Sequence, residues 1–263
     1  MNIFFRELKA SRKSLIIWSV IAVLFCWMGF QKASAYFENP EMLAIIDTLP
    51  PGLMAAFGVE AFNLTTVTGF FGVMVIYFAL ILGIAATMWG SGVISKEERD
   101  KTVEFSLTLP VRRSRLITAK ALAMLVNCIV LLIVTGGAML GSVAKYNPDQ
   151  EFYKFAGLCL LSFLILELIF LALGIFLGCA LKKHKLAGAL GVWILIGMYF
   201  LSILIGLDEN LDFLKYFTPF KYFDAGNLLH DGMNIGFVLL SAAIIVVLVA
   251  GSYATYAKRD LYI

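Results

Sequence analysis

Six long apolar segments recur along the chain and are separated by shorter polar ones. A helix of about 20 apolar residues crosses the hydrocarbon core of a bilayer, so each segment predicts a membrane-spanning helix. The predicted spans cover residues 15–30, 67–89, 116–143, 155–181, 186–206 and 235–253. This pattern predicts an all-α integral membrane protein, with a single transmembrane domain over residues 1–263.

The composition agrees with this class. The chain is 61% hydrophobic and 15% charged, and its mean hydropathy is +0.89. Soluble domains are about 45–50% apolar and about 25% charged, so an ordinary soluble domain is excluded.

The polar segment between the second and third predicted spans, residues 92–120, carries more pattern than a connector requires. Glu97 and Lys101 stand in the favourable i,i+4 order, which predicts a helix in the first part of the segment. Apolar residues including Leu107 follow within that helix, and Pro110 ends it. A solvated connector explains the charges but not the apolar stripe. The segment therefore indicates a short helix that docks against another chain.

The N-terminal residues 1–13 place Phe4 and Leu8 on one side of a helix, with basic residues elsewhere. This is typical of an amphipathic helix that lies in the membrane interface, although an ordinary basic flank explains it equally well. An AxA-like sequence at residues 33–35 also resembles a signal-peptide cleavage site. We expect the first span to be retained, because its apolar run is closer to membrane-span length.

The basic residues are distributed unequally between the two sides of the membrane. Six spans place both termini on one side, and 16 of the 21 Lys and Arg residues lie there. The remaining five lie in the loops of the other side. Cytoplasmic loops of membrane proteins carry the excess of Lys and Arg, so both termini and residues 92–120 are predicted to be cytoplasmic.

One acidic residue, Glu167, lies near the middle of a predicted span. A charge there costs about 2.5–3.5 kcal/mol on insertion scales. Gly174 and Gly178 fall within about 20° of Glu167 on a helical wheel and form a small-xxx-small pair that lets another helix approach closely. Glu167 is therefore predicted to face a packed interface or a cavity. It is either a substrate-path or ion-coupling carboxylate, or a protonated or hydrogen-bonded structural residue.

The third predicted span contains a second small-xxx-small pair, Gly137 and Gly141, and one strongly polar side chain, Asn127. Helix packing explains the glycine pair. Asn127 is a second candidate for a substrate path or a helix interface.

Several classes of site are not indicated. Four cysteines lie within apolar runs, without metal-ligand or disulfide spacing: Cys26, Cys128, Cys159 and Cys179. His184 and His230 also lack partners at ligand spacing, so no metal site is predicted. No GxxxxGK[ST] pattern occurs, and we therefore expect a non-catalytic chain without a nucleotide site of its own.

The polar segment resembles the signature between the second and third spans of type-2 ABC exporter permeases. The matching residues are Ile94, Glu97, Glu98, Arg99, Thr102, Glu104, Leu107, Pro110, Arg112, Arg113 and Lys120. Lys101 departs from the pattern, because many members have glycine there. The resemblance extends over the whole chain, including the run from Thr218 to Asp224 before the last span.

The resemblance implies a cytoplasmic coupling helix that docks into a separate ATP-binding subunit, and an N-terminal elbow helix on the inner leaflet. It implies two permease chains, identical or paralogous, and two ATPases that bind ATP and Mg, in a bacterial cytoplasmic membrane and in contact with lipids. No nucleic-acid partner is expected. The implied ATPase-coupling residues are Glu97, Glu98, Thr102, Glu104, Leu107, Pro110 and Arg113. The implied outer-gate residues are Tyr216, Pro219, Phe220 and Tyr222.

The cargo is less defined. Apolar spans rich in Phe and Met favour a hydrophobic or amphipathic substrate such as a drug, an antimicrobial peptide or a lipid. Because the family also includes sodium exporters, ion extrusion through Glu167 is the alternative. An ATP-independent secondary transporter would be expected to show internal repeats and broken spans, and the sequence shows neither clearly.

Overall fold

The computed structural model describes residues 3–33, 62–99, 112–181 and 184–257, together with Thr48, Pro50 and Met54. At positions 32, 97–99, 184, 185 and 209 the description covers the backbone alone. The helices are α1 (Ile3–Ala33), α4 (Val67–Arg99), α6 (Arg113–Val143), the short 3-10 helix η1 (Ala144–Tyr146), α7 (Gln150–Ala180), α8 (His184–Leu207), the 3-10 helix η2 (Glu209–Phe217), α9 (Pro219–Tyr222), α10 (Ala225–His230) and α11 (Ile235–Ala257).

Six helices in the described part of the chain are long and apolar enough to cross a membrane: α1, α4, α6, α7, α8 and α11. The predicted all-α fold with six spans is therefore confirmed. In a bilayer the backbone must satisfy its own hydrogen bonds, and a helix does so within one segment.

The predicted N-terminal elbow is not a separate helix, because residues 3–13 continue into the first span as part of α1. No glycine or proline precedes Gly29, so nothing in this sequence interrupts the backbone hydrogen bonds. Phe4 and Leu8, which suggested an interfacial helix, pack instead against the core of the bundle.

The start of the helix predicted within residues 92–120 belongs to a longer helix, and the remainder of that prediction, beyond Arg99, lies outside the described residues. α4 continues past Trp89, the predicted end of the second span, as far as Arg99. Lys, Glu and Arg are good helix formers, so the change from apolar to charged residues alters the environment of the helix but does not end it.

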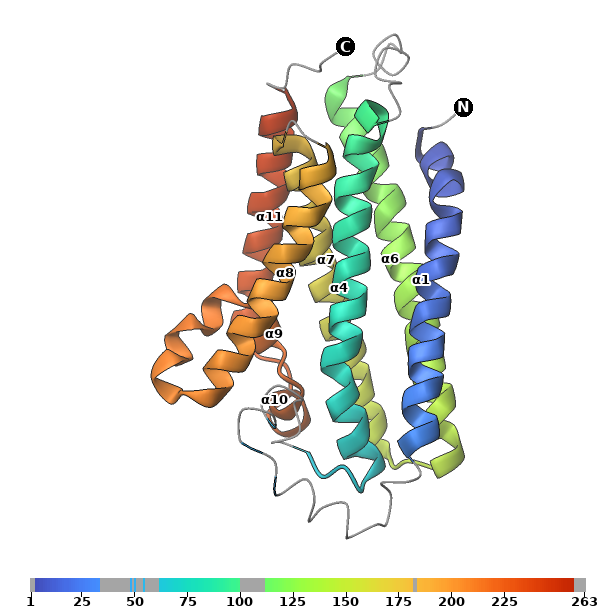
Figure 1. Ribbon diagram of the computed structural model, residues 1–263, viewed down its shortest axis with the longest axis vertical. Coiled ribbons are helices and arrows are strands. Elements are labelled where there is room, and N and C mark those ends of the chain that lie inside the picture. Colours follow the sequence, from blue (N-terminus) through green and yellow to red (C-terminus); the bar gives the residue numbers. More distant parts are fainter. Residues whose placement is uncertain are drawn as a thin grey trace.

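α4 and α7 form the centre of the bundle. α1 packs along α6, whereas α8 and α11 pack against the α4–α7 pair. The start of α1 and the end of α11 lie at the same end of the bundle (Figure 1). We call this end, which contains Arg6, Lys96 and Arg113, the basic end. η2, α9 and α10 lie toward the opposite end (Figure 1).

Glycines bring the central helices into close contact. A Cβ atom built on Gly174 of α7 would lie 2.4 Å from the carbonyl oxygen of Thr87 on α4. A Cβ on Gly90 of α4 would lie 2.5 Å from the carbonyl oxygen of Leu171. Gly191 of α8 meets the same stretch of α4, because its Cβ would lie 2.5 Å from the Thr87 methyl group. These contacts hold α4, α7 and α8 together near the basic end.

Candidate functional site

A cavity of about 210 Å³ lies between α4, α7 and α8, on the side of α9 and α10. Its wall combines aromatic and aliphatic side chains with hydroxyl groups. The apolar part includes Val75, Ala79, Phe163, Leu166 and Phe220, and the hydroxyl groups belong to Ser162, Tyr199 and Ser202. A mainly apolar wall with a few polar groups is typical of a small-molecule site.

One ion pair lies at this cavity. Lys221 Nζ and a carboxylate oxygen of Asp224 are 3.7 Å apart, and both side chains are partly exposed. Asp224 also caps α10, because its side chain accepts a hydrogen bond from the backbone N–H of Gly226 at 3.0 Å. A partly exposed pair of this kind contributes little to stability. It does place one positive and one negative group beside the cavity.

The segment that contains the predicted outer gate forms the wall of this cavity on the side away from the basic end. Phe220 packs against Phe170 and Tyr199, with ring centroids 5.6 and 6.0 Å apart. Thr218 fixes the segment to α8, since its hydroxyl donates to the carbonyl oxygen of Met198 at 2.8 Å. Pro219 is buried at the first turn of α9.

Tyr222 is held between two partners. Its ring stacks on Phe237 of α11 with centroids 5.0 Å apart, and its hydroxyl donates to the carbonyl oxygen of Tyr216. Burial raises the pKa of Tyr222 above its ordinary value of 10.0, so the hydroxyl keeps the proton that it donates. Tyr216 itself is 56% exposed. Of the four predicted gate residues, only Phe220 lines the cavity.

Glu167 is completely buried in the middle of α7. Neither carboxyl oxygen has a hydrogen-bond partner among the described residues. The buried thiol of Cys128 on the neighbouring helix α6 interacts electrostatically with this carboxyl group. Glu167 is not among the residues that line the 210 Å³ cavity. A buried polar group without a partner is destabilising, so this carboxyl group lowers the stability of the bundle.

Gly174 and Gly178 lie on the face of α7 that contacts α4. A Cβ on Gly178 would lie 3.0 Å from Cβ of Ile94 and 3.1 Å from the carbonyl oxygen of Ser91. Both glycines thus serve helix contact in the bundle, and neither lines the 210 Å³ cavity.

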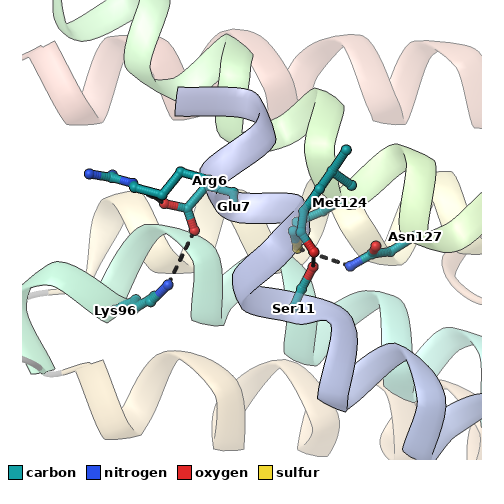
Figure 2. Close-up of polar contacts among 7 residues, drawn as sticks. Arg6, Glu7, Ser11, Lys96, Met124 and Asn127 are labelled. Atoms are coloured by element: carbon teal, nitrogen blue, oxygen red, sulfur yellow. Dashed lines mark hydrogen bonds and ion pairs between the residues drawn. The ribbon is translucent and has the colours of Figure 1, made fainter. Parts of the chain in front are cut away.

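Asn127 is buried in α6, and its amide nitrogen lies 3.9 Å from the sulfur of Met124 (Figure 2). Sulfur is a weak acceptor, so this contact satisfies the amide poorly. Thr135, two turns farther along α6, is also buried, and its hydroxyl has no hydrogen-bond partner within the described ranges. Poorly satisfied polar groups therefore recur along α6 as well as at Glu167.

The family model described as ABC-2 family transporter protein matches residues 1–261, nearly the whole chain. The chain belongs to the ABC-2 transporter family. No curated protein matches the chain. Membership makes this ABC-2 protein a multi-pass membrane subunit of a kind that is generally non-catalytic and works with a partner ATP-binding subunit.

Most of the predicted ATPase-coupling residues of this ABC-2 protein fall outside the described residues. These are Thr102, Glu104, Leu107 and Pro110. Glu97 and Glu98 belong to the last turns of α4, where the backbone alone is described. The end of α4 and the start of α6 both lie at the basic end, so the segment between them begins and ends there (Figure 1).

Arg113 is described in full and contacts another helix of the same chain. Its guanidinium donates to the carbonyl oxygens of Tyr256 and Ala257, at 3.4 and 3.3 Å. These carbonyls end α11, where a positive charge interacts favourably with the helix dipole. Nearby, the hydroxyl groups of Thr118 and Tyr253 lie 2.7 Å apart. α6 and α11 are thus tied together at the basic end.

Arg113→Ala is expected to lower the free energy of unfolding by about 0.3–1 kcal/mol, because the last carbonyls of α11 lose a charged donor. Arg113→Lys should restore part of this loss, whereas Arg112→Ala, at the N-cap of α6, serves as the control. Thermal unfolding of the purified full chain measures the difference. Equal midpoints for Arg113→Ala and Arg112→Ala would contradict a contribution from these hydrogen bonds.

Sequence reasoning missed most of the cavity. Tyr199 and Ser202 lie one helical turn apart in the fifth span, so their spacing places both on one face. Hydroxyl and aromatic residues are frequent in membrane helices, and this signal alone does not distinguish a cavity from a helix contact. A second cavity, beside Glu7 and Lys96 at the basic end, was also missed.

Proposed function

We propose that this chain is the membrane-spanning subunit of an ATP-driven exporter, driven by a separate ATPase that docks on residues 92–120. One observation supports this most directly: α4 is a single helix that reaches from the cavity wall at Gly72 and Val75 to Arg99. Residues 100–111, which hold most of the coupling signature, follow directly. A displacement at the end of α4 would therefore be transmitted along a rigid helix toward the cavity.

In this proposal the basic end faces the cytoplasm. The unequal distribution of Lys and Arg supports that orientation, since such residues accumulate in cytoplasmic loops. Both termini are then cytoplasmic, and α9 and α10 lie on the outer side of a bacterial cytoplasmic membrane. The gate role proposed for Tyr216, Pro219, Phe220 and Tyr222 follows from that placement.

The proposed working unit contains two permease chains and two ATPases, which hold the ATP and Mg. Large apolar side chains on the outside of the bundle support burial against a second chain or lipid. Trp193 and Phe200 of α8 are 70% and 59% exposed, and Val247 of α11 is 69% exposed. In water such surfaces would be unfavourable, whereas lipid and a second permease chain both cover them.

The proposed cargo is a hydrophobic or amphipathic molecule, such as a drug, an antimicrobial peptide or a lipid. The cavity supports this class, because aromatic walls from Phe163 and Phe220 surround a few hydroxyl groups. Its volume of about 210 Å³ holds only part of a drug-sized molecule, for which sites of about 300–1,000 Å³ are usual. The remainder of such a molecule would lie against the second chain.

Ion extrusion is the second candidate function. Glu167 favours it, because its buried carboxyl oxygens have no hydrogen-bond partner in the described part of the chain. A sodium ion or another small cation would supply the missing interactions. ATP-independent transport has less support, since α4, α6 and α7 are each continuous over their full length, unlike the broken spans of many secondary transporters.

Glu97→Ala combined with Glu98→Ala is expected to reduce substrate-stimulated ATP hydrolysis by about fivefold or more, because coupling between two sites is typically worth that much. The measurement is co-purification of ATP-binding subunits with the tagged chain from its native host, followed by an ATPase assay in lipid vesicles. Glu151→Ala, an exposed carboxylate at the first turn of α7, is the matched control. Unchanged assembly and unchanged stimulation in the double variant would refute the coupling role.

A further inference from the structure

α1 and α4 are in direct contact toward the end of the bundle opposite the basic end. Phe25 packs edge-on against Phe78 with centroids 5.4 Å apart, and Phe30 packs against Phe70 at 5.6 Å. A Cβ built on Gly29 would lie 3.2 Å from the sulfur of Met74. Tight aromatic packing fixes the two helices relative to each other in this half.

Toward the basic end, a cavity of about 160 Å³ separates the same two helices. Its lining comes from α1, α4 and α6, and includes Ala10, Met88, Gly92 and Met124. Among the described residues, a Cβ on Gly92 would meet no atom within 4 Å. A Cβ on Gly90, which faces α7, would lie 2.5 Å from the carbonyl oxygen of Leu171. The basic end of α4 is therefore supported by α7 on one side and faces open space on the side of α1.

Two polar contacts cross or border this space. The indole N–H of Trp89 donates to the hydroxyl oxygen of Ser14 at 2.8 Å. Nearer the end of α4, Lys96 Nζ lies 3.4 Å from a carboxylate oxygen of Glu7 (Figure 2). The other carboxylate oxygen of Glu7 lies 3.2 Å from Arg6. In this half, polar side chains rather than packed rings join α1 to α4.

The side chain of Glu7 is only 3% exposed, although glutamate is an ionisable residue and Glu7 lies near the start of the chain. A desolvated carboxylate is stable only when cations or donors accompany it, so Glu7 favours the position of α4 that brings Lys96 beside it. α1 in turn is held by α6, along which it packs, and the Cys26 sulfur lies 3.4 Å from the Ser142 hydroxyl. Packing against α6 thus fixes the position of α1, and with it the position of Glu7.

We propose that Glu7 is a positioning residue, which through Lys96 sets the place of the basic end of α4 and of the residues 100–111 that follow it. Because the 160 Å³ cavity leaves few packed side chains between α1 and α4 there, loss of the ion pair lets the separation of the two helices vary. The aromatic contacts at Phe25 and Phe30 keep that separation fixed in the other half. This inference deepens the proposed function and rests on it for the link to ATP hydrolysis.

The first experiment needs no ATPase and uses the full chain in phospholipid vesicles. Spin labels are placed at Lys9 of α1 and Met88 of α4, which are both exposed, while the four native cysteines are buried. Glu7→Gln and Lys96→Gln are each expected to broaden the distance distribution between the labels. The exchanged variant, Glu7→Lys with Lys96→Glu, is expected to restore a narrow distribution, because it re-forms the pair with opposite polarity.

A second pair of labels, at Met28 and Thr68, reports the half of the bundle with the aromatic contacts. Its distance distribution should be the same in all variants, which also shows that each variant is folded. Distributions for Lys9 and Met88 that remain as narrow in Glu7→Gln as in the unaltered chain would overturn the positioning role. So would an exchanged variant that stays as broad as the single ones.

The second experiment adds the ATP-binding subunit that co-purifies with the chain and measures substrate moved per ATP hydrolysed. Glu7→Gln is expected to lower this ratio by about fivefold or more, and the exchanged variant to recover it. If the unaltered chain fails to bind or stimulate any ATPase while the label distances respond as expected, the proposed function is wrong and the positioning role stands. If the unaltered chain couples normally and the distances do not respond, the positioning role is wrong.

Discussion

Gly174→Val is expected to prevent the chain from folding into the described bundle. The new Cβ would lie 2.4 Å from the carbonyl oxygen of Thr87 and 3.0 Å from the backbone nitrogen of Ser91. Backbone atoms inside a helix cannot rotate away as a side chain can, so α4 and α7 would have to separate. Overpacking of a core typically costs about 1–3 kcal/mol, and a clash with backbone belongs at or above the upper end of that range.

The matched control is Gly137→Val in α6, where an added Cβ would meet no atom within 4 Å. The yield of folded protein in detergent and its thermal midpoint measure both variants. Gly137→Val should resemble the unaltered chain, and Gly174→Val should give little folded protein. Equal yields and midpoints for the two variants would mean that α4 and α7 do not approach as closely as the structure has them.

Gly137 and Gly174 show how far helix contacts can be predicted from the sequence. Gly137 and Gly141 form the same small-xxx-small pattern as Gly174 and Gly178, and nothing in the sequence separates the two pairs. The pattern states that a helix can approach, but which helix does so depends on how the whole bundle packs. Among the described residues, a Cβ on Gly174 or Gly178 would contact α4, whereas a Cβ on Gly137 or Gly141 would meet no atom within 4 Å.

The six spans could be predicted because the bilayer imposes a strong requirement on length and polarity. The ends of the helices could not. Residues 3–13 and 90–99 are polar enough to leave the membrane, yet both continue as parts of α1 and α4. Hydropathy reports the surroundings of a residue, whereas a helix ends where its backbone hydrogen bonds are interrupted, and neither stretch contains a proline.

The charges near the ends of the spans predict the orientation of the protein in the membrane, but not the ion pairs that individual residues form. Their distribution predicts an orientation, because the excess of Lys and Arg acts collectively. The burial of Glu7 beside Lys96 depends on two residues far apart in the sequence, so no local pattern reveals it. Glu167 differs from Glu7 in this respect, because a single acidic residue inside an apolar run can be recognised as a candidate site from the sequence alone.

Glu167→Leu is expected to stabilise the chain and, if the cargo is a cation, to remove most of its transport. A buried carboxyl group without a hydrogen-bond partner destabilises a fold by about 1–3 kcal/mol, and leucine removes that penalty with a side chain of similar size. A cation that crosses the bundle at Glu167 would be bound by its carboxylate, and leucine offers no such ligand. Thermal unfolding of the full chain measures the first effect. Uptake of labelled substrate or sodium into inverted vesicles containing the ATPase measures the second.

Glu167→Gln separates the effect of Glu167 on stability from its effect on transport, because the amide keeps the size and polarity of the side chain but does not ionise. Its expected result is a thermal midpoint close to that of the unaltered chain together with the same loss of transport. Glu151→Gln makes the same chemical change at an exposed position of α7 and should alter neither property. Full transport in Glu167→Gln would show that the carboxyl group is dispensable for moving the cargo. A lower midpoint for Glu167→Leu would show that the carboxyl group contributes favourable interactions to the folded state, which is the opposite of what its lack of a hydrogen-bond partner among the described residues implies.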